Sequence, residues 1–107
     1  MKPSHIEHIG IAVSDLARSV EMYKNVFGLK CYSIEEVTDQ KVRTAFFMVG
    51  QTKIELLEAT SPESPVAKFI AKKGEGVHHI AFAVPGLEEG LKHAEENGIR
   101  LIDPTPR

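Results

Sequence analysis

Two spacings of apolar residues alternate along this chain, one typical of strands and the other of helices. Apolar, β-branched runs predict strands at residues 6–13, 29–37, 42–49, 52–58, 77–84 and 99–102. Apolar positions three and four residues apart predict helices over 16–27, 66–73 and 87–97. Ser14 or Asp15 can cap the first helix, and Gly28 is a natural residue to end it.

These elements follow one another in the order βαβββ, and the pattern then begins again. The gaps at 39–41 and 50–51 are short, so we expect the three strands after the first helix to be antiparallel neighbours. The stretch ATSPESP is a linker by composition. We therefore predict one α+β domain over residues 1–107, with module one at 5–58, a linker and short helix at 59–76, and a partial module two at 77–107.

The start of the second half repeats the start of the first. HIGIAV at residues 8–13 aligns with HIAFAV at residues 79–84, an offset of 71, and four of the six positions are identical. Such self-similarity indicates a duplicated supersecondary unit, although two βα units can also share a pattern by chance. The repeat makes His79, and not its neighbour His78, the counterpart of His8.

Strand alternation places these two histidines on faces made of small residues. The small residues are Gly10 and Ala12 beside His8, and Ala81 and Ala83 beside His79. We expect the opposite, bulky faces to pack under the helices, and the small residues to leave a hollow above the sheet. By the same alternation His78 points the other way, either as a residue behind the site or as a surface residue.

An acidic residue in the middle of a predicted strand extends this candidate site. Glu55 lies among apolar neighbours, where a carboxylate is costly unless it is exposed, paired or bound to a cation. Two histidines and a carboxylate suit several divalent metal ions. Each residue alone has a structural explanation, but the repeated histidine favours a metal site at His8, Glu55 and His79.

Composition narrows the class of protein further. The formal net charge is -2 with acidic and basic residues interspersed, so no basic stripe indicates a nucleic-acid partner. No apolar run approaches the ~20 residues of a membrane-spanning helix. Cys31 is the only cysteine, which excludes an intrachain disulfide and a cysteine-based zinc site. These features, and an N-terminus without the apolar core of a signal peptide, lead us to expect a cytoplasmic protein.

Three motifs, HIGIAV, KIELLE and HHIAFAV, together resemble the vicinal oxygen chelate superfamily, which includes glyoxalase I, extradiol dioxygenases and methylmalonyl-CoA epimerase. The blocks SPVAKFI and KGEGVHHIAF are most similar to the methylmalonyl-CoA epimerases, and the resemblance spans essentially the whole chain. The fold of that superfamily pairs two βαβββ modules into a curved mixed sheet around a divalent metal. The resemblance implies this fold here, with the second module incomplete.

The resemblance also implies ligands and a reaction. It places a metal ion (Co, Zn, Ni, Mn or Mg) on His8, Glu55 and His79. The fourth ligand of the family, a glutamate that also acts in catalysis, is expected beyond residue 107. A second catalytic carboxylate of the family falls near Thr44, whose hydroxyl cannot act as a base at neutral pH, so the acid and base are unassigned. We expect the protein to continue past Arg107, because a half-sheet would leave an unpaired edge.

The implied activity is epimerisation of methylmalonyl-CoA by 1,1-proton transfer through a metal-stabilised enolate. The implied partners are an acyl-CoA substrate and a second copy of the chain in a homodimer, with no nucleic acid and no membrane. Three alternatives stay open: another metal-dependent enzyme such as a glyoxalase I-like lyase, a non-catalytic small-molecule binding protein, or an inactive fragment if the protein ends at Arg107.

Overall fold

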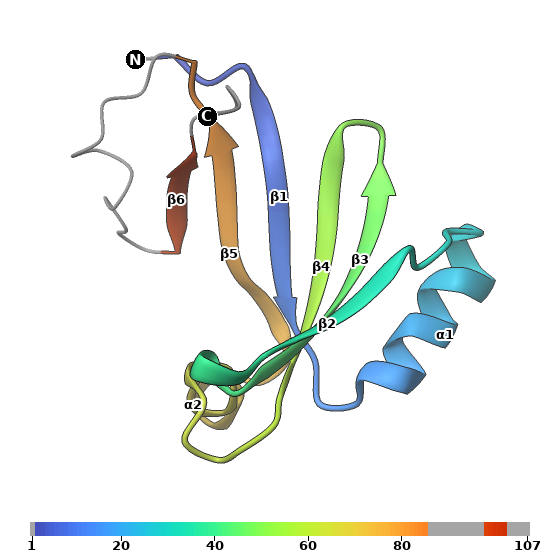
Figure 1. The fold of residues 1–107 in the computed structure, drawn as a ribbon, viewed down its shortest axis with the longest axis vertical. Coiled ribbons are helices and arrows are strands. Elements are labelled where there is room, and N and C mark those ends of the chain that lie inside the picture. Colours follow the sequence, from blue (N-terminus) through green and yellow to red (C-terminus); the bar gives the residue numbers. More distant parts are fainter. Residues whose placement is uncertain (1, 86–97, 103–107) are drawn as a thin grey trace.

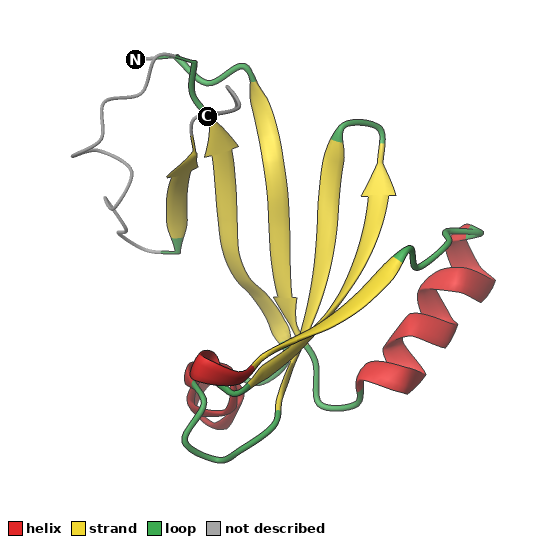
Figure 2. Ribbon diagram, in the orientation of Figure 1, coloured by secondary structure: helices red, strands yellow, loops and turns green. Residues whose placement is uncertain are grey.

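The computed structural model describes residues 2–85 and 98–102, which form a strongly curved sheet with two helices (Figures 1 and 2). The strands are β1 (His5–Ala12), β2 (Ser33–Val37), β3 (Val42–Val49), β4 (Thr52–Ala59), β5 (Gly76–Ala83) and β6 (Ile99–Ile102). The helices are α1 (Leu16–Phe27) and α2 (Pro65–Lys73), with a short 3₁₀ turn η1 (Thr38–Gln40) before β3. The helix expected over residues 87–97 lies outside the described residues.

The described strands form one mixed sheet in the order β2-β3-β4-β1-β5-β6. The prediction that β2, β3 and β4 are antiparallel neighbours is confirmed. β1 lies in the centre of the sheet, parallel to β4 and antiparallel to β5. This arrangement brings the two repeated segments side by side, and it confirms the predicted α+β fold with a curved mixed sheet (Figure 1).

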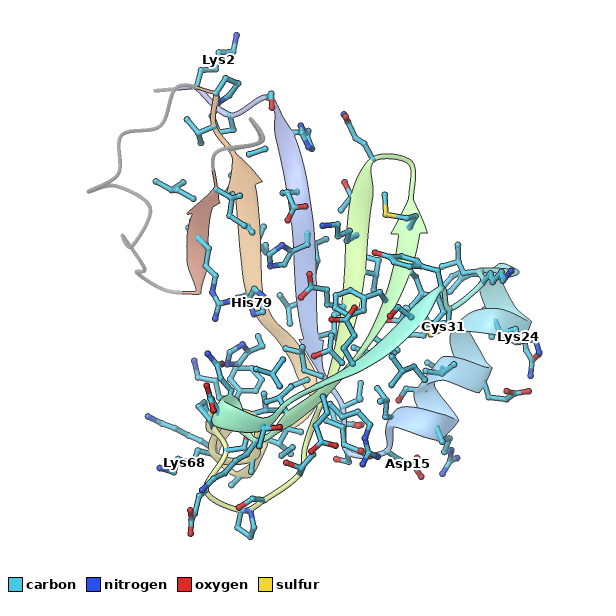
Figure 3. The ribbon with its side chains drawn as sticks, viewed as in Figure 1. Lys2, Asp15, Lys24, Cys31, Lys68 and His79 are labelled. Atoms are coloured by element: carbon cyan, nitrogen blue, oxygen red, sulfur yellow. The ribbon has the colours of Figure 1, made fainter. Side chains whose placement is uncertain are left out.

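The prediction that a strand begins at residue 29 is wrong, because β2 begins at Ser33. Leu29 and Cys31 instead pack against the hydrophobic cluster beneath α1. Figure 3 shows Cys31 beside α1 and well away from His79. Pairing with β3 starts at Tyr32, whose backbone N–H donates to the carbonyl oxygen of Phe46 at 3.0 Å. Leu29 and Cys31 therefore contribute side chains to this cluster and do not belong to the strand.

α1 covers one face of the sheet at β3 and β4. The Asp15 carboxylate accepts a hydrogen bond from the Arg18 N–H at 3.1 Å, and Gly28 ends the helix at a left-handed φ of 68°. The cluster beneath it consists of Val13, Leu16, Ala45, Phe47 and Leu56, with Ile11 and Ile54 packed against it. The bulky face of β1 therefore packs toward α1, as predicted. Val26 and Phe27, at the end of α1, stay 66% and 63% exposed.

α2 packs on the opposite face of the sheet, at the end of β1 and β4. Its first turn begins after Ser64, whose hydroxyl accepts a hydrogen bond from the Val66 N–H at 3.2 Å. Val66 joins a second buried cluster with Ala12, Val42 and Leu57. Ala12 and Leu57 are paired across β1 and β4. They lie on the same face as His8, which we call the site face, and α2 closes one end of it.

Two β-bulges interrupt the pairing of β1 with β5. The register shifts between Ile6 and His8 on β1, and again beside Gly10, where β5 advances from His79 to Val77. The first bulge leaves Glu7 outside the register, and the second leaves His78 outside it. A bulge inserts an extra residue into one strand and turns its side chain away from strict alternation.

This irregular register has a two-fold pseudosymmetry. His8 pairs with Ala81, and Gly10 pairs with His79. Moving either pair by the repeat offset of 71 residues produces the other pair, and the two bulges are exchanged in the same way. A duplicated unit explains why one strand repeats even the irregularities of its partner.

Candidate metal centre

The structure brings His8, Glu55 and His79 together on the site face. The three residues come from the adjacent strands β1, β4 and β5, and one ligand atom from each lies within 4.8 Å of the others. Glu55 comes into place because β4 runs parallel to β1 and pairs its Glu55 with Gly10. Figure 3 shows the His79 side chain midway along β5. The sequence-predicted ligand set is therefore a cluster in space.

The two imidazole rings meet edge to face. Their Nε2 atoms are 3.0 Å apart, and the ring planes are 86° from parallel. The other nitrogen of the His8 ring, Nδ1, lies 2.5 Å from an oxygen of Glu7 and 3.6 Å from an oxygen of Glu55. Each ring thus presents Nε2 to the other ring, with its Nδ1 directed toward a neighbouring side chain.

Gly10 makes room for the second ring. A Cβ atom at this position would lie 2.2 Å from Cε1 of His79, far closer than non-bonded carbon atoms approach. The prediction that small residues leave space above the sheet is therefore confirmed at Gly10, and the imidazole of His79 occupies that space.

Burial controls the protonation of the site. His8 and His79 are only 8% and 5% exposed. Burial, with added repulsion from Arg100, His8 and His78, lowers the pKa of His79 to about 3, so that its imidazole is neutral at neutral pH. Burial also raises the pKa of the Glu55 carboxyl, against the opposing attraction of His8. Burial acts in the same direction on Glu7, but hydrogen bonds with His8 and Lys53 outweigh it and lower the pKa of Glu7.

This donor set fits a divalent cation. Neutral imidazole nitrogens and a carboxylate oxygen are the ligands that zinc and neighbouring transition ions accept. Two nitrogens 3.0 Å apart can both lie at the ~2.1 Å typical of a zinc–histidine bond. Two lone pairs facing each other at 3.0 Å would repel, so either a shared proton or a cation has to lie between them.

The contacts of His78 agree with the expectation that it lies behind the site, but its side chain does not point away from the site, because the bulge in β5 interrupts the alternation of side chains. Nδ1 of His78 lies 2.9 Å from Nδ1 of His79. The His78 ring also packs edge-on against Phe69 of α2, with ring centroids 5.0 Å apart. His78 therefore directly contacts a candidate ligand.

A cavity of about 580 Å³ opens over the site face. Its polar wall is formed by Thr44, Glu55, His78, His79 and Arg100, together with Gln40. Its apolar wall includes Val42, Leu57 and Val66. Thr44 is buried and lines the cavity. The cavity is large enough for the reactive end of a small-molecule ligand.

Sequence reasoning missed two residues at this site, Glu7 and Arg100. Arg100 reaches the site face because β6 runs parallel to β5 and pairs Arg100 with Ala81. No local pattern predicts that pairing. Glu7 could have been found, since it stands 71 residues before His78 and extends the repeat by one position.

Comparison with known proteins decides the family. The model of the glyoxalase/bleomycin resistance protein/dioxygenase superfamily matches residues 7–107. The chain belongs to this superfamily. The resemblance seen in the sequence motifs is thereby confirmed, and so is the fold class.

Three relatives each match 80% or more of this chain. An uncharacterized protein from Bacillus subtilis is 43% identical over 104 residues, which cover 97% of this chain and 74% of that protein. A mitochondrial methylmalonyl-CoA epimerase from Dictyostelium discoideum is 35% identical over 103 residues, covering 95% of this chain and 62% of that protein. A variant of Streptomyces coelicolor methylmalonyl-CoA epimerase, solved with 2-nitronate-propionyl-CoA, superposes with a TM-score of 0.74 at 39% identity.

The match with the Streptomyces structure covers 80% of this chain and 66% of that chain. The chain therefore spans between about three fifths and three quarters of the length of these three relatives. In the described part of the chain, neither helix is long and apolar enough to cross a membrane.

Proposed function

We propose that this protein is a metal-dependent epimerase that inverts the carbon between the thioester and the carboxylate of methylmalonyl-CoA or a closely similar acyl-CoA. The observation that carries the proposal is the cluster of His8, Glu55 and His79, of which Glu55 and His79 line a cavity large enough for that part of the substrate. The names of the Dictyostelium and Streptomyces relatives support the choice of substrate class.

The reaction needs stabilisation of negative charge. Removal of the substrate proton places charge on the oxygen of the thioester carbonyl, and return of a proton to the opposite side of the carbon gives the epimer. When bound, a divalent cation supplies Lewis-acid stabilisation of that developing charge. In this proposal His8, Glu55 and His79 hold the cation, and the burial of the two histidines strengthens the electrostatic interactions there.

Other walls of the cavity suit the rest of the substrate. The Arg100 guanidinium provides positive charge on the site face, where it complements the substrate carboxylate. Val42, Leu57 and Val66 offer an apolar surface for a methyl group and keep water from the reacting carbon. A carboxylate and a methyl group on one carbon thus find complementary surfaces in this cavity.

The acid and base of the reaction are not assigned to the described residues. Glu55 is the carboxylate on the described cavity wall, and we assign it to the cation. Thr44 lines the cavity but has a hydroxyl that stays protonated at neutral pH, so it can hydrogen-bond a substrate but cannot remove a proton. A carboxylate beyond residue 107, implied by the family resemblance, is the expected acid–base group.

Proton exchange tests the proposal. The protein is incubated in heavy water with methylmalonyl-CoA and Co²⁺ or Zn²⁺, and deuterium at C2 is followed by mass spectrometry. We expect metal-dependent exchange that disappears in His79→Ala. His5→Ala is the matched control, because His5 also lies on β1 but bonds the Ser4 hydroxyl at 2.9 Å. Metal binding without any exchange by the full-length protein would contradict the epimerase, and a hemithioacetal assay would then test a glyoxalase I-like lyase.

The proposal also includes the metal, the assembly and the location expected from the sequence. The metal is one of Co, Zn, Ni, Mn or Mg, and calorimetric titration of each ion would rank them. The protein acts as a homodimer in the cytoplasm, and light scattering of the purified protein tests the dimer. A monomer at the protein concentrations used in the exchange assay would contradict the homodimer but not the epimerase activity.

A further inference from the structure

The two bulge residues have equivalent positions but different chemistry. Glu7 precedes His8 and lies 2.5 Å from its Nδ1, while His78 precedes His79 and lies 2.9 Å from its Nδ1. Glu7 and His78 are separated by the repeat offset of 71 residues, and so are His8 and His79. Each bulge thus directs one side chain toward the Nδ1 atom of the histidine that follows it.

The direction of the hydrogen bonds follows from what each group can donate. A carboxylate only accepts, so the Glu7 contact requires a proton on Nδ1 of His8. If His8 is neutral, its Nε2 then carries a lone pair and must accept from Nε2–H of His79, 3.0 Å away. Nδ1 of His79 in turn accepts from Nδ1–H of His78. With no cation between the two Nε2 atoms, these contacts would form one chain of hydrogen bonds from His78 through His79 and His8 to Glu7.

A cation between the Nε2 atoms changes only one end of this chain. His8 already presents a lone pair at Nε2, so it binds the cation as it stands. His79 must move its proton from Nε2 to Nδ1. His78 then accepts at its Nδ1 and carries its own proton on Nε2, so no proton is gained or lost overall. An imidazole can make this exchange because it has both a donor and an acceptor nitrogen, whereas a carboxylate cannot.

We propose that Glu7 is a positioning residue that holds His8 in the metal-binding tautomer, and that His78 is a second positioning residue that allows His79 to change tautomer when a cation binds. The inference rests on the proposed metal site. Lys53 supports it, because its Nζ lies 3.0 Å from the second oxygen of Glu7 and fixes the carboxylate from the other side. Groups behind metal-bound histidines commonly fix the ring orientation and tautomer in this manner.

The tautomers can be read directly. In protein labelled with ¹⁵N-histidine, two-bond ¹H–¹⁵N correlations distinguish Nδ1–H from Nε2–H, and Zn²⁺ is diamagnetic. We expect His8 to be Nδ1–H with and without Zn²⁺, and His79 to change from Nε2–H to Nδ1–H on binding. An Nε2–H tautomer of metal-free His8, or a His79 tautomer that zinc leaves unchanged, would overturn the proposal.

Glu7→Gln tests the role of the carboxylate, since an amide can either donate or accept. We expect a mixture of His8 tautomers and a loss of roughly 10- to 100-fold in Zn²⁺ affinity by calorimetry. Glu36→Gln is the matched control, because Glu36 is an exposed strand residue 3.8 Å from Arg43. Thermal unfolding reports any loss of folding separately. Destabilisation with unchanged His8 tautomers would show that Glu7 is merely structural and would overturn the proposal.

These readouts separate this inference from the proposed function. If the protein binds Zn²⁺ and shows the expected tautomers but exchanges no substrate proton, the epimerase fails and the positioning roles stand. If substrate exchange proceeds while His8 is Nε2–H in the metal-free protein, the epimerase stands and the role of Glu7 is refuted.

Discussion

The site has two halves, one on β1 and one on β5, whose backbones are equivalent but whose side chains differ. Both strands have the same register, the same bulge and a histidine after that bulge. One histidine is backed by Glu7 and the other by His78, and Gly10 on β1 corresponds to Ala81 on β5. The difference teaches that the duplicated backbone determines where the rings lie, while single substitutions determine what each ring can do.

The strongest test of this comparison removes each ring in turn. We expect His8→Ala and His79→Ala each to weaken metal binding by roughly 100-fold or more, because each leaves an incomplete set of ligands. Calorimetric titration with Zn²⁺ measures the effect, and elemental analysis of the purified variants checks it. Retention of metal by either variant would break the equivalence of the two halves.

The glycine and the alanine that the halves exchange provide the next test. Gly10→Ala places a Cβ 2.2 Å from Cε1 of His79, so we expect the ring to shift away from the proposed cation site. We expect this displacement of His79 to lower Zn²⁺ affinity by roughly 10-fold or more, as does loss of a hydrogen bond that orients a metal ligand. The matched variant Ala81→Gly should leave affinity almost unchanged and cost about 0.5–1 kcal/mol of stability through backbone entropy. Equal loss of affinity in both would contradict the steric argument.

A smaller effect is expected from the residue behind the second ring. His78→Ala removes the partner of His79 Nδ1 and leaves its place to water. Because water can also donate or accept, we expect a loss of only a few-fold in Zn²⁺ affinity, less than in Glu7→Gln. Calorimetry of the two variants side by side measures the difference. A larger loss in His78→Ala than in Glu7→Gln would reverse the proposed roles.

The weakest effect concerns pH and the metal-free protein. The folded state lowers the pKa of His79 from 6.5 to about 3, so the unfolded chain binds more protons between these values. The contribution of neutral His79 to the free energy of unfolding is therefore fully present above pH 6.5, and it is lost as the pH falls toward 3. Burial of Glu55 raises its pKa and acts oppositely, favouring the fold as the pH falls.

His79→Gln isolates the contribution of His79 to this pH dependence. Urea unfolding of wild type and variant in the presence of a chelator, at several pH values, gives the difference in unfolding free energy between them. We expect the wild type to lose more stability than the variant as the pH falls from 6.5 toward 3. Parallel pH profiles would show that the second ring is not held neutral by the fold.

The sequence predicted the cluster of His8, Glu55 and His79 because its members can be read from patterns in the sequence. His8 and His79 stand at equivalent positions of a repeat, and Glu55 is an acid within an apolar strand. The direction of the His78 side chain was misjudged because strict alternation holds only without a bulge, and this bulge has no glycine at the extra position to reveal it. Arg100 was missed because its place depends on the parallel pairing of β5 with β6.

The fold shows the same division between local and distant causes. The caps at Asp15 and Ser64 and the antiparallel order of β2, β3 and β4 followed from local residue chemistry. The central place of β1 did not, because it depends on contacts between segments that are far apart in the chain. The side of the sheet that α2 covers also depends on contacts between distant segments, since Val66 packs against Ala12 and Leu57.

The pairing of β1 with β5 also has a consequence for the lifetime of the folded protein. A cation on His8 and His79 joins two strands whose ligands are 71 residues apart, a contact that forms slowly because the intervening chain must first be ordered. An ion that binds the native state alone shifts the equilibrium by mass action. Because its ligands meet only in the assembled sheet, it should mainly slow unfolding. Metal supply would then govern how long the protein survives proteolysis as well as whether it is active.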